Sequence, residues 1–317
     1  MVSLCVIAGG VGAARLLRGA QDVVVGPSLT AIVNVADDDV ISGLSISPDL
    51  DTVVYTCAEA IDPDRGWGLA DETWRAMESQ RRYTDSAGRS DVGWFNLGDR
   101  DLGTHLYRSA RLARGATLSE VTAEIAAAWG LSMRVVPVSD DAIATRLVTD
   151  EGEIAFQDYF VRLQHGVEVH GVSFAGAMTA TAAPGVLDAI AAAEVIIIAP
   201  SNPIVSIGPV LAVPGVRDAL VARRDDTVAI SGIIGGKALK GPADRLLVEL
   251  GHESSAVGVA RLYAEFAATL VVDDVDAGLA DAVEATGMRC VVAPTIMSTR
   301  ADAAALTSVC IDAAGGG

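Results

Sequence analysis

The chain has 317 residues, of which 51% are hydrophobic and only 4% aromatic, so it can bury a large core built mainly from aliphatic side chains. Its 23 basic and 41 acidic residues give a formal net charge of −18, which argues against nucleic acid as a partner because nucleic-acid binding needs a basic surface. The same charge repels anionic substrates, so a phosphate site has to be built locally from backbone amides, a few cationic side chains and metal.

The first predicted element is a strand over residues 2–8, a nearly continuous apolar run typical of a strand buried on both faces. Gly9, Gly10 and Gly12 follow it, and then a helical stretch through residue 20. The amides of such a turn, together with the start of the helix, can hold an anion. A tight strand-to-helix turn without a ligand also requires glycine, so this motif alone leaves both interpretations open.

A second strand, predicted over residues 29–35, is followed by five aspartates within fifteen residues. They are Asp37, Asp38, Asp39, Asp49 and Asp51. Five like charges cannot be buried unpaired, so either they are solvated or a cation lies among them. The apolar residues between them favour a packed segment, and Mg²⁺ typically takes one or two carboxylates plus substrate phosphates. We therefore expect acidic loops up to about residue 69 that return their carboxylates to a divalent cation, and metal-assisted chemistry on a phosphate ester.

The rest of the chain is predicted to alternate helices and strands. In chain order, we expect helices at 70–82, 104–114, 119–129, 184–193, 216–223, 242–250, 256–266, 277–286 and 300–313, and strands at 133–138, 195–199, 227–230, 269–272 and 288–292. Residues 145–174 alternate polar and apolar positions instead, which indicates short, partly exposed strands. The pattern predicts an α/β fold: a doubly wound, mostly parallel Rossmann-like sheet with an inserted smaller α/β subdomain. We expect one domain over residues 1–317 with the insertion at approximately 140–180.

Cysteine usage and hydropathy predict a cytoplasmic protein. Cys5, Cys57, Cys290 and Cys310 lie far apart without metal-ligand or redox spacing, and most of them sit in apolar strings, so reduced core cysteines are expected. No basic segment precedes the first apolar run, and glycines interrupt it, so a signal peptide is not expected. No apolar run approaches the roughly 18 residues of a membrane span, so no membrane partner is expected.

Unusual sequences follow several of the predicted strands. They lie at 9–12, 37–51, 139–141, 200–203 and 231–237. Ligands bind beyond the C-terminal ends of the strands in this fold, so the convergence predicts a binding site better than any single motif does. Ser201 and Asn202, held between two prolines, offer short polar groups to a nucleotide base or phosphate, although a helix cap at either residue is the alternative.

Several of these strings, taken in order, resemble the 2-phospho-L-lactate transferase family. They are Gly-Gly-Val-Gly-Ala-Ala-Arg-Leu-Leu from Gly9, Asn34 with Asp37-Asp38, Ser-Pro-Asp-Leu-Asp-Thr at 47–52, Leu-Gly-Asp-Arg-Asp at 97–101, Ser-Asp-Asp at 139–141, and Ala-Pro-Ser-Asn-Pro-Ile-Val-Ser-Ile-Gly-Pro at 199–209. The resemblance runs from residue 2 to roughly 300. An insertion at 62–68 is similar to that of the actinobacterial branch, called phosphoenolpyruvate transferase.

The resemblance implies a step in making coenzyme F(420). A phosphoenolpyruvyl or 2-phospholactyl unit would move from its guanosine-diphosphate-activated form to the ribityl hydroxyl of the deazaflavin Fo, and GMP would leave. Members of the family use Mg²⁺ and are typically homodimers. Which three-carbon acid is transferred stays open, because a pocket separates such similar acids only weakly unless it hydrogen-bonds the difference.

Carried over residue by residue, the resemblance implies a set of site residues. Asp37 and Asp49 match the metal ligands, while Asp51 and Arg100 match positions that contact Fo. The residues on segments that line the nucleotide site are Gly9, Gly10, Gly12, Ser201 and Asn202. Asp37, Asp49 and Asp51 form the expected catalytic set, with Asp51 either accepting the proton of the Fo hydroxyl or only hydrogen-bonding it. Val40 stands where relatives often carry Trp, which leaves the shape of the Fo pocket open.

Two other functions fit parts of the sequence. A non-catalytic nucleotide-sugar-binding regulator of the gluconeogenesis-factor-like type shares the opening Gly-Gly-x-Gly and the α/β core, but it would not need the paired Asp49 and Asp51. A nicotinamide-dependent oxidoreductase would use the glycine turn and place a ribose on Asp37. That reading leaves the rest of the acidic cluster unexplained.

Overall fold

The computed structural model describes residues 2–89 and 93–315. Within them a central sheet of seven parallel strands has the order β14–β13–β10–β9–β1–β2–β5. The strands are β1 (Leu4–Ala8), β2 (Leu29–Val33), β5 (Arg134–Pro137), β9 (Val195–Ile198), β10 (Thr227–Ile230), β13 (Thr269–Val272) and β14 (Arg289–Val292). From β1 the chain adds strands toward one edge and later, from β9, toward the other. The predicted doubly wound α/β fold is therefore confirmed.

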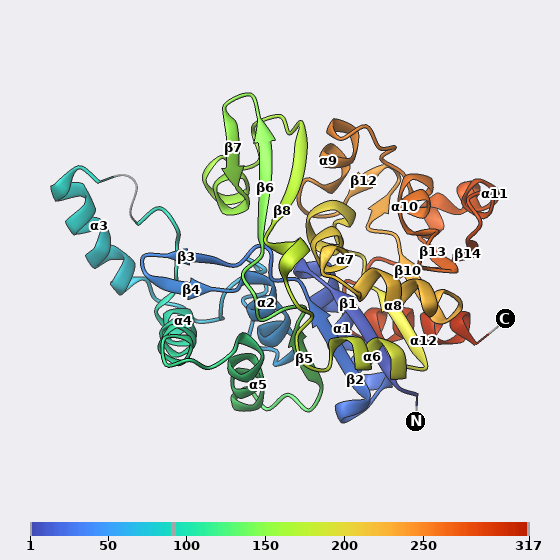
Figure 1. The fold of residues 1–317 in the computed structure, drawn as a ribbon, viewed down its shortest axis with the longest axis horizontal. Helices are drawn as coiled ribbons and strands as arrows, with labels where there is room; N and C mark the ends of the chain where they lie inside the picture. Colours follow the sequence, from blue (N-terminus) through green and yellow to red (C-terminus); the bar gives the residue numbers. More distant parts are fainter. Residues whose placement is uncertain (1, 90–92, 316–317) are drawn as a thin grey trace.

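Helices cover both faces of this sheet (Figure 1). They are α1 (Gly10–Val23), α2 (Pro48–Cys57), α3 (Arg75–Ala87), α4 (Asp99–Leu112), α5 (Leu118–Ala128), α6 (Val186–Ala192), α7 (Gly208–Ala212), α8 (Val216–Ala222), α9 (Ala243–Glu249), α10 (Ala256–Tyr263), α11 (Ala280–Glu284) and α12 (Arg300–Ala314). Shorter 3-10 turns cover Gly26–Ser28, Ala177–Thr179, Arg224–Asp226 and Asp274–Leu279, and π-helical turns cover Asp158–Arg162 and Pro203–Ile207. In Figure 1, α6 and α8 lie in front of the sheet, and α1 and α12 lie behind it.

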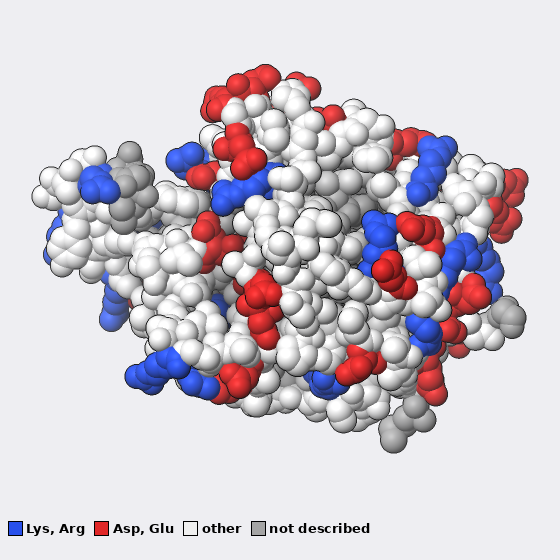
Figure 2. All heavy atoms as spheres, viewed as in Figure 1, with Lys and Arg blue, Asp and Glu red and all other residues white. Residues whose placement is uncertain are grey.

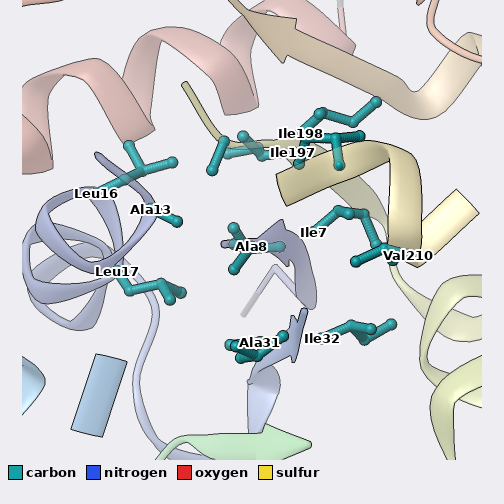
Figure 3. Close-up of a cluster of buried hydrophobic side chains, with 14 of the residues drawn as sticks. Ile7, Ala8, Ala13, Leu16, Leu17, Ala31, Ile32, Ile197, Ile198 and Val210 are labelled. Atoms are coloured by element: carbon teal, nitrogen blue, oxygen red, sulfur yellow. The ribbon is translucent and has the colours of Figure 1, made fainter. Parts of the chain in front are cut away.

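The core lies between these layers because successive side chains of a strand point to opposite faces. Figure 3 shows Ile7 pointing toward Val210 of α7, while the next residue, Ala8, lies on the opposite side, toward Ala13 of α1. All five residues of β1 are buried, which explains why its sequence is apolar without alternation. The tight packing fixes where β1 and β2 end, and so fixes the residues that follow them.

The insertion is an antiparallel sheet with the strand order β7–β6–β8. Its strands are β6 (Ala144–Thr149), β7 (Gly152–Ala155) and β8 (Gly171–Ala175). Leu147, Tyr159 and Val169 form a small core of its own, which also contacts Val205 and Leu246 of the main body. The expected short strands are confirmed, and they are accompanied by the π-helical turn at Asp158–Arg162 and the 3-10 turn at Ala177–Thr179 where an α/β unit was expected.

The prediction of acidic loops up to residue 69 is wrong for two segments. From the third aspartate on, the chain forms a hairpin of β3 (Asp39–Ile41) and β4 (Leu44–Ile46), and α2 begins shortly after it, at Pro48. Proline suits the first helical position because its missing N–H has no partner there in any case, and aspartate is favourable in the first turn. Asp49 and Asp51 therefore project from the start of a helix.

Other boundaries also differ from the prediction. The helix expected at 70–82 begins and ends later, as α3, and stops where Gly88 takes a left-handed conformation. The helix expected from residue 104 begins at Asp99, so Arg100 lies in its first turn and not in a loop. The region expected as one helix at 277–286 divides into a 3-10 turn and α11. A further two-stranded hairpin, β11 (Ile233–Ile234) with β12 (Lys237–Ala238), follows β10.

The state of the cysteines, the length of the helices and the surface charge can be compared with what the sequence predicts. All four cysteines are free, and three of them are buried. In the described part of the chain no single helix is long and apolar enough to cross a membrane; Pro203–Ala212 and Val216–Ala222 reach that size only together and are bent by 94°. On the face shown in Figure 2, acidic and basic groups of the described residues are interspersed and form no continuous basic area.

Candidate functional site

The two aspartates expected to bind metal come together at the C-terminal edge of the sheet. Asp37 lies in the turn after β2, and Asp49 lies in the first turn of α2. The amide Nδ2 of Asn34 donates to the Oδ2 atoms of both, at 3.2 Å to Asp37 and 3.0 Å to Asp49. Both carboxylates are more than 90% buried. The fold therefore places two acidic groups from different elements around one donor.

The electrostatics of this pair favour a bound cation. Burial raises the pKa of Asp37 well above its ordinary value, and the nearby Asp49 raises it further, while hydrogen bonds from Thr145 and Asn34 oppose the shift. Burial also raises the pKa of Asp49 to about 6, against hydrogen bonds from Asn34 and the Gly10 amide. A divalent cation between the two carboxylates would remove this penalty.

A small cavity of about 50 Å³ opens beside Asp37. It is lined by Ala36, Asp37, Asp38, Asp39, Ala144, Thr145, Arg146, Ala155, Phe156 and Gln157. Asp49 is not among its lining residues, so the cavity lies to one side of the carboxylate pair, and it is large enough for a water molecule. The donor set of carboxylate oxygens is the one that Mg²⁺ prefers. The residues present therefore fit a hard divalent cation.

The inserted sheet holds the Asp37 turn from the other side. Thr145 donates through Oγ1 to Oδ1 of Asp37 at 3.2 Å, and Gln157 donates through Nε2 to the Asp37 carbonyl oxygen at 2.8 Å. The Thr145 amide also donates to the carbonyl of Ala36. Sequence reasoning missed both residues, and no local signal marks them because they lie more than a hundred positions away. Sequence reasoning also assigned no role to Asn34, although a polar residue directly after β2 lies at the edge of the sheet where ligands bind.

The glycine turn lies against the same carboxylate. A Cβ on Gly9 would come within 3.1 Å of Oδ2 of Asp49, and one on Gly12 within 2.5 Å of the Pro200 carbonyl oxygen. Gly10 has a φ of +72° and donates its amide to Asp49. Each glycine is thus required by close approach or by backbone conformation. The turn leads into α1, whose N-terminus is a favourable place for an anion.

Ser201 and Asn202 follow β9 at the same edge. Ser201 is buried and donates through Oγ to the carbonyl of Gly9 at 2.7 Å, so it links the two strand ends. Oδ1 of Asn202 accepts from the amides of Ile204 and Val205, at 2.9 and 3.3 Å. This confirms the alternative considered for Asn202, a helix cap on Pro203–Ile207. The structure brings both residues to the glycine turn, and contact with a nucleotide stays a prediction.

Asp51 belongs to a second buried cluster between α2 and α4. Both of its carboxylate oxygens accept from the Arg108 guanidinium, with 3.0 Å from Nη1 to Oδ2. His105 lies 3.7 Å from Asp51 and 3.3 Å from Asp101, and Tyr55 donates to Asp101 at 2.7 Å. Ligand-type atoms of Asp51, Asp101 and His105 lie within 4.8 Å of one another. Because Arg108 already supplies the positive charge, we interpret this cluster as an ion-pair network and not as a metal centre.

Asp38 lies between the two clusters. Its Oδ2 accepts from Oγ of Ser47 at 2.7 Å, while its Oδ1 is buried with no hydrogen-bond partner among the described residues. Burial raises the pKa of Asp38 well above its ordinary value, against the Ser47 hydrogen bond and the charge of Arg108. An unpartnered buried oxygen is costly, which is a further sign that this region receives a polar or charged ligand.

Arg100 and Val40 lie at the rim. Arg100 is exposed in the first turn of α4, donates through Nη1 to the Ala70 carbonyl, and has its own amide bonded to Glu72. Among the described residues it has no hydrogen bond or ion pair with Asp51. Val40 is 68% exposed on the β3–β4 hairpin. The structure therefore does not bring the two expected Fo contacts together directly.

Comparisons with known proteins show which family this chain belongs to. A family model described as 2-phospho-L-lactate transferase CofD matches residues 4–303. Curated relatives include phosphoenolpyruvate transferase of Streptomyces griseus, 43% identical over 307 residues that span 95% of this chain and 95% of the relative. Phosphoenolpyruvate transferase of Kitasatospora aureofaciens is 44% identical over 301 residues, 92% of this chain and 91% of the relative.

Among solved structures, the fold is similar to a Bacillus halodurans protein described as a member of the upf0052 family. The two superpose with a TM-score of 0.61 at 18% identity, over 98% of this chain and 99% of that chain. At this identity the likeness supports the α/β fold alone.

Proposed function

Since the chain belongs to the 2-phospho-L-lactate transferase family, we propose that it moves a phosphoenolpyruvyl or 2-phospholactyl unit from a guanosine-diphosphate-activated acid to the ribityl hydroxyl of the deazaflavin Fo. This is a transferase role in coenzyme F(420) biosynthesis. The hydroxyl oxygen bonds to the phosphorus that carries the three-carbon acid, and the bond from that phosphorus to the bridging diphosphate oxygen breaks. GMP leaves, and the hydroxyl proton passes to solvent or to a carboxylate of the acidic cluster.

One observation carries the site assignment: Asp37 and Asp49 are buried side by side next to the glycine turn, and both have a raised pKa. Mg²⁺ held by these two carboxylates would neutralise the diphosphate and stabilise the charge that develops during in-line displacement. The two aspartates are therefore the proposed metal ligands. Their fixed positions, set by Asn34 and Thr145, provide the preorganisation that such catalysis requires.

The nucleotide is proposed to lie along the glycine turn. Asp49 accepts from the Gly10 amide, so the diphosphate would meet the amides of Gly9 and Gly12 and the positive end of α1. Ser201 and Asn202 line the neighbouring strand end. The chain has a net charge of −18, so these amides and the cation are the means by which it would attract a diphosphate.

Asp51 and Arg100 are proposed to orient Fo. Both oxygens of Asp51 are engaged by Arg108, which supports a role in holding the substrate hydroxyl by a hydrogen bond over a role as proton acceptor. Arg100 is exposed at the start of α4, where its Nη1 donates to the Ala70 carbonyl and its other guanidinium donors would meet a ligand from solvent. A homodimer in the cytoplasm completes the proposal; light scattering on the purified protein tests the dimer.

Mass spectrometry of the reaction products tests the function. The protein is incubated with Fo, Mg²⁺ and, in separate reactions, the guanosine-diphosphate-activated forms of phosphoenolpyruvate, phospholactate and phosphoglycerate. We expect Fo to gain one acid-phosphate unit with equimolar GMP, with the phosphoenolpyruvyl donor best because the similar relatives carry that name. Binding of guanosine diphosphate without any product from the three donors would instead favour a regulator and contradict the transferase proposal.

A further inference from the structure

The side chain of Asn34 connects the two proposed metal ligands, and nothing above gives it a function. We propose that Asn34 is a positioning residue that fixes a two-carboxylate cation site, and that this site is completed only when a diphosphate supplies further oxygen ligands. The inference rests on the proposed function, because it takes Asp37 and Asp49 as the cation ligands.

Every polar atom of the Asn34 side chain makes a hydrogen bond. It is fully buried; Nδ2 donates to Oδ2 of Asp37 at 3.2 Å and to Oδ2 of Asp49 at 3.0 Å, and Oδ1 accepts from the Ala36 amide at 2.9 Å. The amide group has two N–H donors, so each carboxylate can receive one. If the Asn34 side-chain amide were flipped, its oxygen would face both carboxylates, and acceptors would repel acceptors. The hydrogen bonds therefore fix which way the amide points.

The backbone of Asn34 is equally fixed. It is the first residue after β2, and its amide donates to the carbonyl of Ala8 at the end of β1, at 2.9 Å. The donor therefore rests on the two central strands of the sheet, while one acceptor lies in a turn and the other on α2. Ala8 and Val33, at the ends of these strands, are fully buried, whereas Asp37 and Asp49 retain a small exposed fraction. Asn34 is thus placed to set the separation of the two carboxylates.

Because asparagine is neutral, it also keeps the charge of the site at that of the two carboxylates. Aspartate has nearly the same shape, but it would remove both N–H donors and add a third negative charge. Two carboxylates just neutralise a divalent cation, and Mg²⁺ takes six oxygen ligands, so the remaining positions are left to water or phosphate. Cation binding should therefore be weak alone and stronger with a diphosphate, so that the two ligands bind as a pair.

Titration with Mn²⁺ tests this without any turnover. Free Mn²⁺ is followed by electron paramagnetic resonance, with and without guanosine diphosphate, for the wild-type protein, Asn34→Asp and Asn34→Ala. Asn96→Asp is the matched control, since it makes the same change of charge at an exposed asparagine whose side chain accepts a hydrogen bond from Arg81. Thermal unfolding is recorded for each variant in parallel.

Outer-shell partners of metal ligands typically change affinity by about 10- to 100-fold, which sets the expected effects. We expect the wild type and Asn96→Asp to bind Mn²⁺ about tenfold more tightly with the nucleotide. Asn34→Asp should bind it about tenfold more tightly than wild type when the nucleotide is absent, and should gain less from the nucleotide. Asn34→Ala should bind it about tenfold more weakly than wild type when the nucleotide is present.

The outcomes separate the two claims. Wild-type affinity in Asn34→Asp without nucleotide, or in Asn34→Ala with it, would overturn the role of Asn34. If Asn34→Ala does not fold, Asn34→Asp alone tests the role of Asn34. Mn²⁺ should raise the unfolding temperature of Asn34→Asp by more than it raises that of the wild type. A wild-type protein that binds no Mn²⁺ in either condition would contradict the proposed metal ligands, and not only the role of Asn34.

Discussion

Arg108 and Asp51 form a buried ion pair that joins α4 to α2, with side chains only 2% and 8% exposed. Both carboxylate oxygens of Asp51 accept from the guanidinium. The pair connects two helices, and in the proposed function the same Asp51 side chain would also orient Fo. The pair also lies close enough to Asp38 for Arg108 to influence its pKa.

The first prediction concerns the stability that depends on this pair. Arg108→Met should lower the free energy of unfolding by about 3–5 kcal/mol, because it leaves the Asp51 charge buried without a partner. Urea denaturation measures the loss. Arg111→Met, on the same helix, is the control: its partner Glu124 lies in an exposed pair, so only a small fraction of that loss is expected. Similar losses in both variants would contradict a special role for the buried pair.

The second prediction concerns the proposed metal ligands. Asp49→Asn should abolish measurable turnover, a loss of at least about 100-fold, while leaving the fold intact, since asparagine keeps the shape but not the charge. Product formation with Mg²⁺ and circular dichroism measure the two parts. Asp302→Asn is the matched control, because Asp302 also lies in the first turn of a helix, α12, where its carboxylate accepts from the Thr299 amide, and this bond needs no charge. Near-normal turnover by Asp49→Asn would make the metal assignment wrong.

The third prediction concerns pH. The folded-state pKa of Asp49 is raised from 3.8 to about 6, so without metal its contribution to stability is present below about 3.8 and is lost as the pH rises through about 6. In EDTA, Asp49→Asn should therefore gain stability relative to wild type as the pH increases from 4 to 7. Replacing EDTA with Mg²⁺ should restore the stability of the wild-type protein at pH 7. Urea titrations at several pH values check this, and a difference between the two proteins that does not change with pH would contradict it.

The fourth prediction concerns the glycine turn. Gly12→Ala would put a Cβ 2.5 Å from the Pro200 carbonyl oxygen, so the turn must shift, at a cost of about 1–3 kcal/mol and with weaker binding of guanosine diphosphate. Gly103→Ala is the control, because no atom of the described residues lies within 4 Å of the Cβ that alanine would add, and this position is inside α4. That change should stabilise the protein by about 0.5–1 kcal/mol. Calorimetry reports nucleotide affinity and stability for both; equal affinities would contradict the turn as a nucleotide site.

Much of the fold could be predicted because buried parallel strands leave a strong local signal. The strands at 227–230 and 269–272 are found at the predicted bounds, since each is a short apolar run between polar turns. The start of α2 was missed, although Ser47 and Pro48 are a helix-start signal. There the density of aspartates suggested a loop, and the preference of acidic residues for a first helical turn was overlooked.

The site was partly predictable for a similar reason. Asp37 follows a strand end and Asp49 begins the next helix after a short hairpin, so the two are near in sequence and their meeting could be anticipated. Arg108 lies seven residues after Asp101 and three after His105, a spacing that puts all three on one helix face, and this signal was not used. Thr145 and Gln157 reach Asp37 only because the insertion folds back on it, which no local pattern reveals.

Anomalous diffraction from a crystal grown with Mn²⁺ and guanosine diphosphate tests the central claim most directly. The account predicts a single Mn²⁺ peak in contact with carboxylate oxygens of both Asp37 and Asp49, with diphosphate oxygens among its other ligands. A peak between Asp51, Asp101 and His105, or a nucleotide bound with no metal at Asp37 and Asp49, would contradict it.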